Sequence, residues 1–368
     1  MKILHVLLSG CIGGAEKLAL TLAKIQKQNN HDVTIAFLFR GGPIAKQAKD
    51  YGIPIEIFNL KNGYDLVKGF NFFNFLRREK FDIIHIHQSA IAIFFSIFFK
   101  KNAIIIRHEH GGHALGPQKK KVILAMRILS LLVDCHIAIS NATKKGLIQR
   151  FKINYKKIRI VYNGIDLTLF KDRKNKQKLR KQFGLIKNKL VIGSIGRLVS
   201  EKGFEHFLKT AKLIKSAIHN IHFLIVGDGP LRNDLQKLAE KLGIANCVSF
   251  LGERIDVPDL LSIFDVFLLT SNWEPFGIVL VEAMASGLPI VAFNVDGVSE
   301  VVDEKCAVLV EPYNIQKMAD EVIKLLKNSE KRKKMGEYSL KRAELFDINK
   351  KAKEIEELYI NLYKTRSR

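Results

Sequence analysis

The sequence predicts an α/β protein made of two doubly wound halves, each with its own parallel sheet. Two observations support this fold class. Short apolar runs of strand length alternate with longer segments of helical periodicity, and this alternation is interrupted once, by a basic stretch in the middle of the chain. Alternation of this kind is typical of parallel sheets that helices cover on both faces. At 368 residues, the chain is long enough for two cores.

Each half contains six predicted strands. Those of the first half are Ile3–Leu8, Val33–Leu38, Pro54–Phe58, Asp82–Ile86, Ala103–Ile106 and Cys135–Ile139. The second half has Leu190–Ser194, Ile221–Val226, Cys247–Phe250, Val266–Thr270, Ile290–Phe293 and Ala307–Val310. Between the halves, Lys171–Lys189 holds nine Lys and Arg residues against one Asp. We interpret this stretch as the connection and predict domains at residues 1–170 and 171–346.

Composition narrows the function classes. The four cysteines are far apart and form no CxxC pair, so we expect neither a zinc finger nor a disulfide framework, and a reducing, cytoplasmic compartment fits. The longest apolar run, Ala90–Phe99, is half of what a membrane span needs, so no transmembrane helix is predicted. A net charge of +24 favours a polyanion as partner, whether nucleic acid, anionic membrane or phosphorylated substrate, unless it only reflects a background rich in Lys and Asn.

Two loops of the first half carry candidate binding residues. Gly13 and Gly14 follow the first strand and precede a helix, where backbone amides can approach a phosphate. Their spacing departs from GxGxxG, which disfavours a nicotinamide cofactor. After the fifth strand, His108 and His110 point the same way if the strand continues, and with Glu109 or His113 they form a possible metal site. No carboxylate cluster lies nearby, so we favour a single histidine donating a hydrogen bond to a bound ligand, or a plain loop histidine.

The segment Lys119–Leu129 begins with three lysines and continues with apolar residues. We interpret it as a helix packed on the sheet, with a charge placement that also permits contact with anionic lipid.

In the second half, polar residues gather where strands end. Arg197 and Lys202 lie on the loop after the strand at Leu190, and two cations at this spacing can bracket a diphosphate. The stretch Ser271–Pro289 predicts a loop and a helix of about three turns, with Pro275 at the first helical position and Gly287 at the C-terminal cap. Glu274 then lies at the helix mouth beside the amides of Phe276, Gly277, Ile278 and Val279, and Glu282 lies further along. Carboxylates suit sugar hydroxyls, and helix N-termini suit phosphate.

Taken in order, these motifs resemble glycosyltransferase family 4, the retaining group 1 enzymes of the GT-B fold. The match is carried by Gly13–Glu16, Asn163–Asp166, Gly196–Leu198 with Lys202–Gly203, Val226–Pro230 and Glu274–Gly287. The resemblance implies two Rossmann-like domains facing across a cleft, with the second holding the nucleotide-sugar. It also implies that a C-terminal helix, about residues 347–368, docks back on the first domain.

The resemblance also implies roles for the site residues. Glu274 with the amides of Phe276 and Gly277 would hold donor sugar hydroxyls, and Glu282 would hold the ribose. Arg197 and Lys202 would stabilise the leaving diphosphate, assisted by amides around Gly14. His110, which Gly111 follows, fits the family's histidine best, and His108 and His113 remain alternatives. No Asp-x-Asp motif is present, so two cations would take the place of a metal.

We therefore expect a retaining glycosyltransferase that moves a hexose-type sugar from a nucleoside-diphosphate-sugar to a glycan or lipid-linked saccharide, in polysaccharide or lipopolysaccharide biosynthesis. We expect no cofactor, no metal requirement and no nucleic-acid partner, and a cytoplasmic protein that can bind peripherally to the inner face of the membrane. The alternatives are a sugar-nucleotide epimerase of the same fold and a nucleic-acid-binding protein, although no recognition module for nucleic acid is visible.

Overall fold

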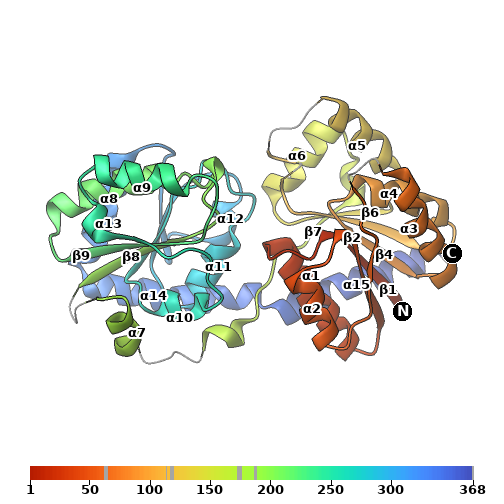
Figure 1. The fold of residues 1–368 in the computed structure, drawn as a ribbon, viewed down its shortest axis with the longest axis horizontal. Helices are drawn as coiled ribbons and strands as arrows, with labels where there is room; N and C mark the ends of the chain where they lie inside the picture. Colours follow the sequence, from red (N-terminus) through yellow and green to blue (C-terminus); the bar gives the residue numbers. More distant parts are fainter. Residues whose placement is uncertain (62–64, 113, 117–119, 172–175, 186–188, 367–368) are drawn as a thin grey trace. The chain divides into compact units, whose positions relative to one another are not determined.

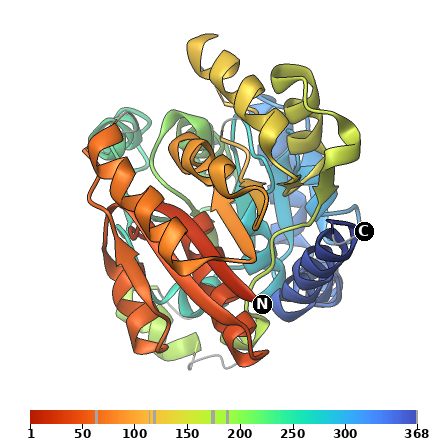
Figure 2. The same ribbon diagram turned by 90° about the vertical axis from the view of Figure 1, so that its right-hand side faces the viewer.

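The computed structural model describes residues 1–61, 65–112, 114–116, 120–171, 176–185 and 189–366. The chain divides into two compact units, one made of Met1–Gly164 with Ile348–Arg368 and the other of Ile165–Asp347 (Figures 1 and 2). The division falls at Gly164, where sequence analysis placed it at residue 170. Ile165 belongs to the second unit because its amide donates a hydrogen bond to the Phe346 carbonyl.

The first unit is built on a parallel seven-stranded sheet of order β3-β2-β1-β4-β5-β6-β7. Its strands are β1 (Lys2–Ser9), β2 (Asp32–Arg40), β3 (Ile55–Ile57), β4 (Ile83–His87), β5 (Ile104–Glu109), β6 (Cys135–Ala138) and β7 (Ile158–Ile160). Its α-helices are α1 (Gly14–Gln28), α2 (Pro43–Asp50), α3 (Leu66–Glu79), α4 (Ala90–Ser96), α5 (Lys120–Leu132), α6 (Asn141–Phe151) and α15 (Ile348–Arg366). Short 3₁₀ helices lie at Ile97–Phe99 and Tyr155–Lys157.

Both faces of this sheet are covered, which explains why strands such as β4 are buried throughout. Helices α3, α4, α5 and α6 cover one face (Figure 1). Helices α1, α2 and α15 cover the other, where Ile355 and Tyr359 of α15 join the core. The C-terminal helix therefore closes the first unit, and its Glu356 accepts hydrogen bonds from Asn29 at the end of α1.

The second unit contains a parallel six-stranded sheet of order β10-β9-β8-β11-β12-β13. Its strands are β8 (Leu190–Ile195), β9 (Ile221–Val226), β10 (Val248–Phe250), β11 (Val266–Leu269), β12 (Ile290–Phe293) and β13 (Ala307–Val310). Its α-helices are α7 (Lys176–Gln182), α8 (Phe204–Ala217), α9 (Arg232–Lys241), α10 (Val257–Ser262), α11 (Ile278–Ala285), α12 (Val298–Val301), α13 (Ile315–Lys327) and α14 (Ser329–Ala343). Further 3₁₀ helices are η3 (Leu167–Phe170), η4 (Ser200–Lys202), η5 (Ala245–Cys247) and η6 (Glu344–Phe346).

The predicted fold class, α/β with two doubly wound parallel sheets, is confirmed. In the second unit, β8 pairs with both β9 and β11, so the strand order changes direction beside β8. Ligands of open α/β sheets bind at the carboxyl ends of strands beside such a change. The loops that follow β8 and β11 are therefore the first place to look for a site.

None of the helices in the described ranges combines the length and the hydropathy that crossing a bilayer requires.

Candidate functional site

The loops after β8 and β11 are joined by close backbone contacts. Gly203 ends η4 with φ of +58°, and a Cβ atom there would lie 2.1 Å from the Thr270 carbonyl oxygen. The Thr270 hydroxyl donates to the Gly203 carbonyl at 3.0 Å, and the Asn272 side chain donates to the Ser200 carbonyl at 2.7 Å. Only glycine combines this conformation with so close an approach, so Gly203 fixes the position of the loop that carries Lys202.

The clearest polar contact of the site links these two loops. Lys202 Nζ donates to Glu274 Oε2 at 2.5 Å, and the Ser271 hydroxyl donates to the same oxygen at 3.3 Å. Glu274 is buried, with 5% of its surface exposed. Its other oxygen, Oε1, makes no hydrogen bond within the described part of the chain. A buried carboxylate held on one side by a cation keeps Oε1 as an acceptor for a ligand.

The backbone of Glu274 is held as firmly as its side chain. The Glu274 amide donates to Asp296 Oδ2 at 2.9 Å, and the Gly297 amide donates to the Glu274 carbonyl at 3.0 Å. Burial raises the pKa of Asp296, the Glu274 amide lowers it in part, and the Glu274 charge raises it further. Asp296 therefore belongs to the site as a support of Glu274, although the sequence analysis did not identify it.

Helix α11 begins later than predicted. Its first residue is Ile278 and its N-cap is Gly277 with φ of +82°, so Pro275 lies in the loop and the helix has eight residues, about two turns. Gly277 has no side chain to cap the helix, and the first amides of a helix lack intrahelical partners. The amide end at Ile278 and Val279 is thus suited to an anion.

The side chain of Phe276 belongs to the hydrophobic core of the second unit. It is 1% exposed and packs edge-on against Phe346, so only its backbone can serve a ligand. Glu282 is half-buried and lies one turn beyond Ile278 on the same face of α11. Sequence analysis placed Glu282 two turns into the helix, and the later start accounts for the difference.

Arg197 lies on the loop after β8 and is exposed. Among the residues that the structure describes, no carboxylate pairs with its guanidinium. The loop itself is rigid: the Leu198 amide donates to the Asp228 carbonyl at 2.9 Å, and a Cβ atom at Gly229 would lie 2.5 Å from the Leu198 carbonyl oxygen. The Gly227–Pro230 turn therefore supports the loop that presents Arg197.

In the first unit, Gly13 is the N-cap of α1 and Gly14 its first residue. Glu16 lies in the first turn, and its carboxylate accepts a hydrogen bond from its own backbone amide. Burial raises the pKa of Glu16, and this hydrogen bond lowers it in part. The helix end thus carries a carboxylate of its own, which a bound phosphate would have to displace.

His110 and the neighbouring Glu109, at the end of strand β5, are embedded in polar contacts. His110 lies just beyond β5, is half-buried, and its Nε2 is 3.0 Å from Nδ1 of His87. Glu109 is fully buried and accepts hydrogen bonds from Arg107 at 2.5 Å and from the Gly111 amide at 3.0 Å. Burial lowers the pKa of His110 to about 4, although the nearby Glu109 charge raises it in part. His113 lies outside the described residues.

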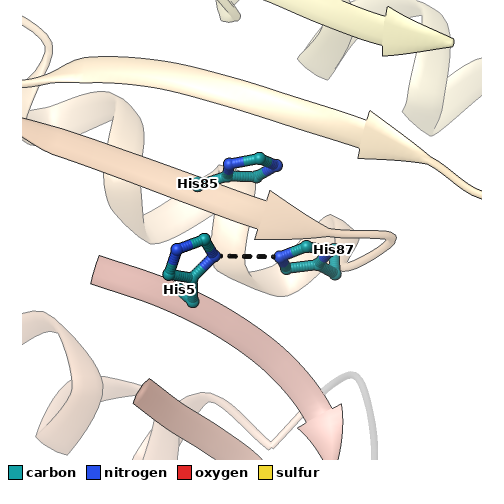
Figure 3. A group of neighbouring side chains, drawn as sticks. All are labelled: His5, His85 and His87. Carbon is teal, nitrogen blue, oxygen red and sulfur yellow. Dashed lines mark hydrogen bonds between the residues drawn. The ribbon is translucent and has the colours of Figure 1, made fainter. Parts of the chain in front are cut away.

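Sequence analysis considered His108 and His110 but missed three neighbouring histidines, His5, His85 and His87. His5, His85, His87 and His108 are all buried within the first unit, and Figure 3 shows the first three. Two groups of three ring nitrogens lie within 4.8 Å of one another: His5, His85 and His87, and His87, His108 and His110. The alternation His85-x-His87 within a strand was the signal that could have revealed them.

Of the predicted site residues, the structure brings Lys202 and Glu274 into contact and places Arg197 on the same loop as Lys202. Phe276, Gly277, Ile278, Val279 and Glu282 lie along one segment that follows Glu274. Gly13, Gly14 and His110 belong to the first unit.

Comparison with known proteins follows the same division. Residues 12–169 match the profile described as Glycosyltransferase Family 4, and residues 175–342 match that of Glycosyl transferases group 1. The UDP-Gal:alpha-D-GlcNAc-diphosphoundecaprenol alpha-1,3-galactosyltransferase of Escherichia coli is 27% identical over 377 residues, with 98% of this chain and 97% of the relative covered. The N-acetyl-alpha-D-glucosaminyl L-malate synthase of Bacillus anthracis is 28% identical over 341 residues, with 89% and 88% covered.

The fold also matches that of a solved structure. HepE of Anabaena, crystallised with UDP, superposes with a TM-score of 0.84 at 25% identity, with 98% of this chain and 100% of that chain covered.

Proposed function

This chain belongs to glycosyltransferase family 4 and has the GT-B fold, and from that premise we propose that it transfers a hexose-type sugar from a UDP-sugar to a lipid-linked saccharide. The single observation that carries the proposal is the contact between Lys202 and Glu274 at the carboxyl edge of the second sheet. It unites a cation for phosphate and a carboxylate for sugar hydroxyls in one pair, with Glu274 buried and Lys202 half-buried.

The comparisons support the choice of donor and acceptor. The name of the E. coli relative specifies UDP-galactose and a diphosphoundecaprenol-linked sugar, and this chain aligns with it over almost its whole length. HepE binds UDP in its crystal structure. We therefore propose UDP as the donor nucleotide.

The second unit would hold the donor. Oε1 of Glu274 accepts a hydrogen bond from a sugar hydroxyl while Oε2 stays with Lys202. The amide end of α11, at Gly277, Ile278 and Val279, faces the diphosphate or the sugar, and Glu282, one turn on, accepts from the ribose hydroxyls. In the first unit, the amides at Gly13 and Gly14 begin helix α1 and are suited to a phosphate group.

Arg197 and Lys202 would stabilise the charge that develops on the leaving diphosphate. Because both lie on one loop held by Gly203, they need little rearrangement when the bond breaks, and preorganised charges stabilise a transition state well. No metal is needed in this scheme, and we propose that the transferase is metal-independent.

We propose that transfer retains the anomeric configuration by departure and attack on the same face. The bond from the anomeric carbon to the phosphate oxygen breaks, and the acceptor oxygen bonds to that carbon. The acceptor's proton passes to the leaving phosphate oxygen. Glu274 is the other nucleophile to consider, but its ion pair with Lys202 ties one of its oxygens and favours a binding role.

An exposed apolar surface supports peripheral membrane binding. Helices α3, α4 and α5 pack side by side on one face of the first sheet. These helices and the 3₁₀ helix that follows α4 leave large apolar side chains exposed: Val67, Phe70, Phe94, Phe98, Leu124, Ile128 and Leu131. Lys120 and Lys121, at the start of α5, are exposed beside them. Apolar residues rimmed by lysines fit the surface of an anionic bilayer, where a lipid-linked acceptor would be found.

The test is thermal unfolding of the purified protein with a panel of nucleoside diphosphates and nucleotide-sugars, in the presence of EDTA. Stabilisation by UDP and one UDP-sugar, lost in Glu282→Gln but kept in Glu330→Gln on the exposed face of α14, supports the donor site. No stabilisation by any nucleotide at millimolar concentration would overturn it. Conversion of the UDP-sugar to another UDP-sugar without acceptor would indicate an epimerase instead.

A further inference from the structure

Five buried or half-buried histidines lie on one face of the first sheet. In the parallel register, His5 of β1 pairs with His85 of β4, and His87 of β4 pairs with His108 of β5. His85 and His87, like His108 and His110, are two residues apart and so point to the same face. That face carries α1 and α15, which supply Gln26 and Tyr359 as further neighbours.

Hydrogen bonds arrange these side chains in two rows. The first row, named here the Gln26 row, runs from Gln26 Oε1 to His5 Nε2 (2.7 Å), from His5 Nδ1 to His87 Nε2 (3.2 Å) and from His87 Nδ1 to His110 Nε2 (3.0 Å). Figure 3 shows its central bond, between His5 and His87. The second row joins the Tyr359 hydroxyl to His85 Nδ1, and His85 Nε2 to His108 Nδ1 at 3.1 Å.

The spacing fits shared protons better than a shared metal ion. Two imidazoles on a tetrahedral zinc ion hold their nitrogens about 3.4 Å apart, with both lone pairs turned toward the ion. The nitrogens within the rows approach to 3.0–3.2 Å, which is hydrogen-bond distance. His85 and His87 are stacked with an angle of 4° between rings 4.6 Å apart, so their lone pairs run parallel rather than converge.

The rings of both rows are neutral near pH 7. Burial lowers the pKa of His5 to about 4, with the Gln26 hydrogen bond raising it in part. Burial also holds the pKa values of His85, His87 and His108 well below the usual range, and the charges of neighbouring histidines lower them further. A neutral imidazole has one N–H donor and one acceptor nitrogen, so each row must have a direction.

Gln26 sets that direction. Its Oε1 can only accept, so His5 carries its proton on Nε2 and accepts at Nδ1. His87 must then donate from Nε2 to His5, which leaves its Nδ1 to accept from Nε2–H of His110. The other amide atom, Gln26 Nε2, is buried and has no hydrogen-bond partner within the described part of the chain.

We propose that the Gln26 row holds the proton of His110 on Nε2, so that His110 presents the lone pair of Nδ1 as an acceptor to a hydroxyl group of a ligand. The second half of this statement rests on the proposed function. Sequence analysis treats His110 as a hydrogen-bond donor, and the row assigns the opposite role. Gln26, His5 and His87 are then positioning residues that act through His110.

The surroundings of His110 support a fixed ring. Its Nδ1 has no hydrogen-bond partner in the part of the chain that the structure covers. The backbone that carries it is held by Glu109, which accepts from the Gly111 amide and from Gln88 Nε2 at 3.1 Å. His108 stacks on His110 with ring centres 4.4 Å apart. Ring position, backbone and proton are thus all determined before a ligand binds.

The first measurement is nitrogen-15 NMR of the full chain labelled at histidine, at pH 7 and without ligand. We expect His5, His87 and His110 each as one neutral tautomer with the proton on Nε2, and a slowly exchanging Nε2 proton on His110. A proton on Nδ1 of His110, a mixture of tautomers, or rapid exchange of the Nε2 proton would overturn the proposal. This readout does not depend on activity.

The second measurement compares three variants. His87→Phe keeps a ring and removes both nitrogens, and we expect the Nε2 proton of His110 to exchange rapidly and kcat/KM for the donor to fall about tenfold. His87→Asn keeps an acceptor at the position of Nδ1 and should restore much of both. The matched control is His136→Phe, since His136 is buried in the adjacent strand β6 and bonds to the Ser130 carbonyl rather than to a row.

The outcomes separate the two claims. The Gln26 row would be overturned if His110 keeps its tautomer and its slowly exchanging Nε2 proton in His87→Phe. It would also be overturned if His87→Phe and His136→Phe lower kcat/KM equally. The expected NMR result together with full activity of His110→Ala would retain the row and remove His110 from the proposed function. If the wild-type chain does not bind the donor, the proposed function is overturned and the Gln26 row is not affected.

Discussion

Lys202 and Glu274 form an ion pair of 2.5 Å although they are 72 residues apart in the chain. The loops that carry them follow β8 and β11, which are neighbours in the second sheet. Glu274 is additionally held through its backbone by Asp296 and Gly297, so the pair is fixed from both sides. A charge pair built this firmly at a strand edge is suited to ligand binding, and its removal should affect catalysis more than folding.

Glu274→Gln tests this directly. We expect kcat to fall by roughly 10- to 100-fold, because a hydrogen bond to a charged group contributes about 1.5–3 kcal/mol and the amide keeps only the shape of the carboxylate. Steady-state kinetics with UDP-sugar measure the loss, and far-UV circular dichroism checks the fold. Glu330→Gln, on α14, is the control. A kcat within twofold of wild type would contradict the role given to Glu274.

Arg197→Ala should lower kcat more than it raises the donor KM, by about 100-fold if the guanidinium stabilises the leaving diphosphate. The side chain is exposed, so the melting temperature should stay within a degree or two. Arg254→Ala offers a comparison, because Arg254 is a partly exposed arginine of the same unit that pairs with Asp256 at 2.7 Å. Equal kinetics for both variants would remove Arg197 from the mechanism.

Gly203→Ala should destabilise the second unit strongly. The new Cβ atom would lie 2.1 Å from the Thr270 carbonyl oxygen, and the residue would be held at φ of +58°. Gly243→Ala is the matched control, since Gly243 has φ of +71° but no heavy atom within 4 Å of its Cβ position. We expect about 1 kcal/mol of destabilisation for Gly243→Ala, from the left-handed backbone alone, and at least twice that for Gly203→Ala. Urea unfolding curves measure both, and equal losses would show that the loops adjust freely.

Stability should fall as the pH is lowered from about 6.5 toward 4. Burial lowers the pKa of His5 and His110 to about 4 in the folded chain, while the unfolded chain protonates near 6.5. The unfolded state therefore binds more protons in this window, and each such histidine costs up to about 3 kcal/mol by its lower end. Gln26 and Tyr359 face the rows from α1 and α15, and Glu109, which pairs with Arg107, is the charged group that acts on His110.

Unfolding free energies measured between pH 8 and pH 4 test this expectation. The slope should become shallower in His5→Phe, which removes one of the low-pKa groups while keeping a ring. A slope that is unchanged in this variant would show that other groups govern acid unfolding.

How far the sequence reaches is clear from particular elements. Twelve of the thirteen strands of the two sheets were predicted because apolar runs and turns are local signals, and the fold class followed from their alternation. The three-residue strand β7 was not among the predicted strands, because its apolar run is too short to stand out. The start of α11 could not, because Pro275 is an ordinary first residue of a helix and only the left-handed backbone at Gly277 delays the helix to Ile278.

Contacts between elements that are distant in the chain could not be predicted from the sequence either. The pairing of Lys202 with Glu274 requires that β8 lie beside β11, and the histidine rows require that β1 lie beside β4. Strand order is a property of the folded sheet that no local pattern contains. Once the order is known, the period of two along each strand places all five histidines on one face.

Binding to anionic membranes should depend on helix α5. Leu124, Ile128 and Leu131 are exposed by 60%, 56% and 69% and follow one another at helical spacing, with Lys120 and Lys121 exposed at the start of the helix. Burying three such side chains in a bilayer interface contributes several kcal/mol, at about 1.5–3 kcal/mol for each fully buried side chain. We therefore expect co-sedimentation with vesicles of phosphatidylglycerol and phosphatidylethanolamine at low salt. Binding should fall at least tenfold in the double variant Leu124→Glu and Ile128→Glu.

Two controls make this result specific. Ile255→Glu changes an isoleucine that is 93% exposed in the second unit, and it should leave vesicle binding unchanged. Neutral phosphatidylcholine vesicles should bind the wild-type chain less well than anionic ones, and salt should reduce binding to the anionic vesicles, because the lysines act through screened charge. Equal binding of the double variant and wild type would place the membrane contact elsewhere. Failure of the wild type to bind anionic vesicles at low salt would overturn the membrane proposal while leaving the donor site untouched.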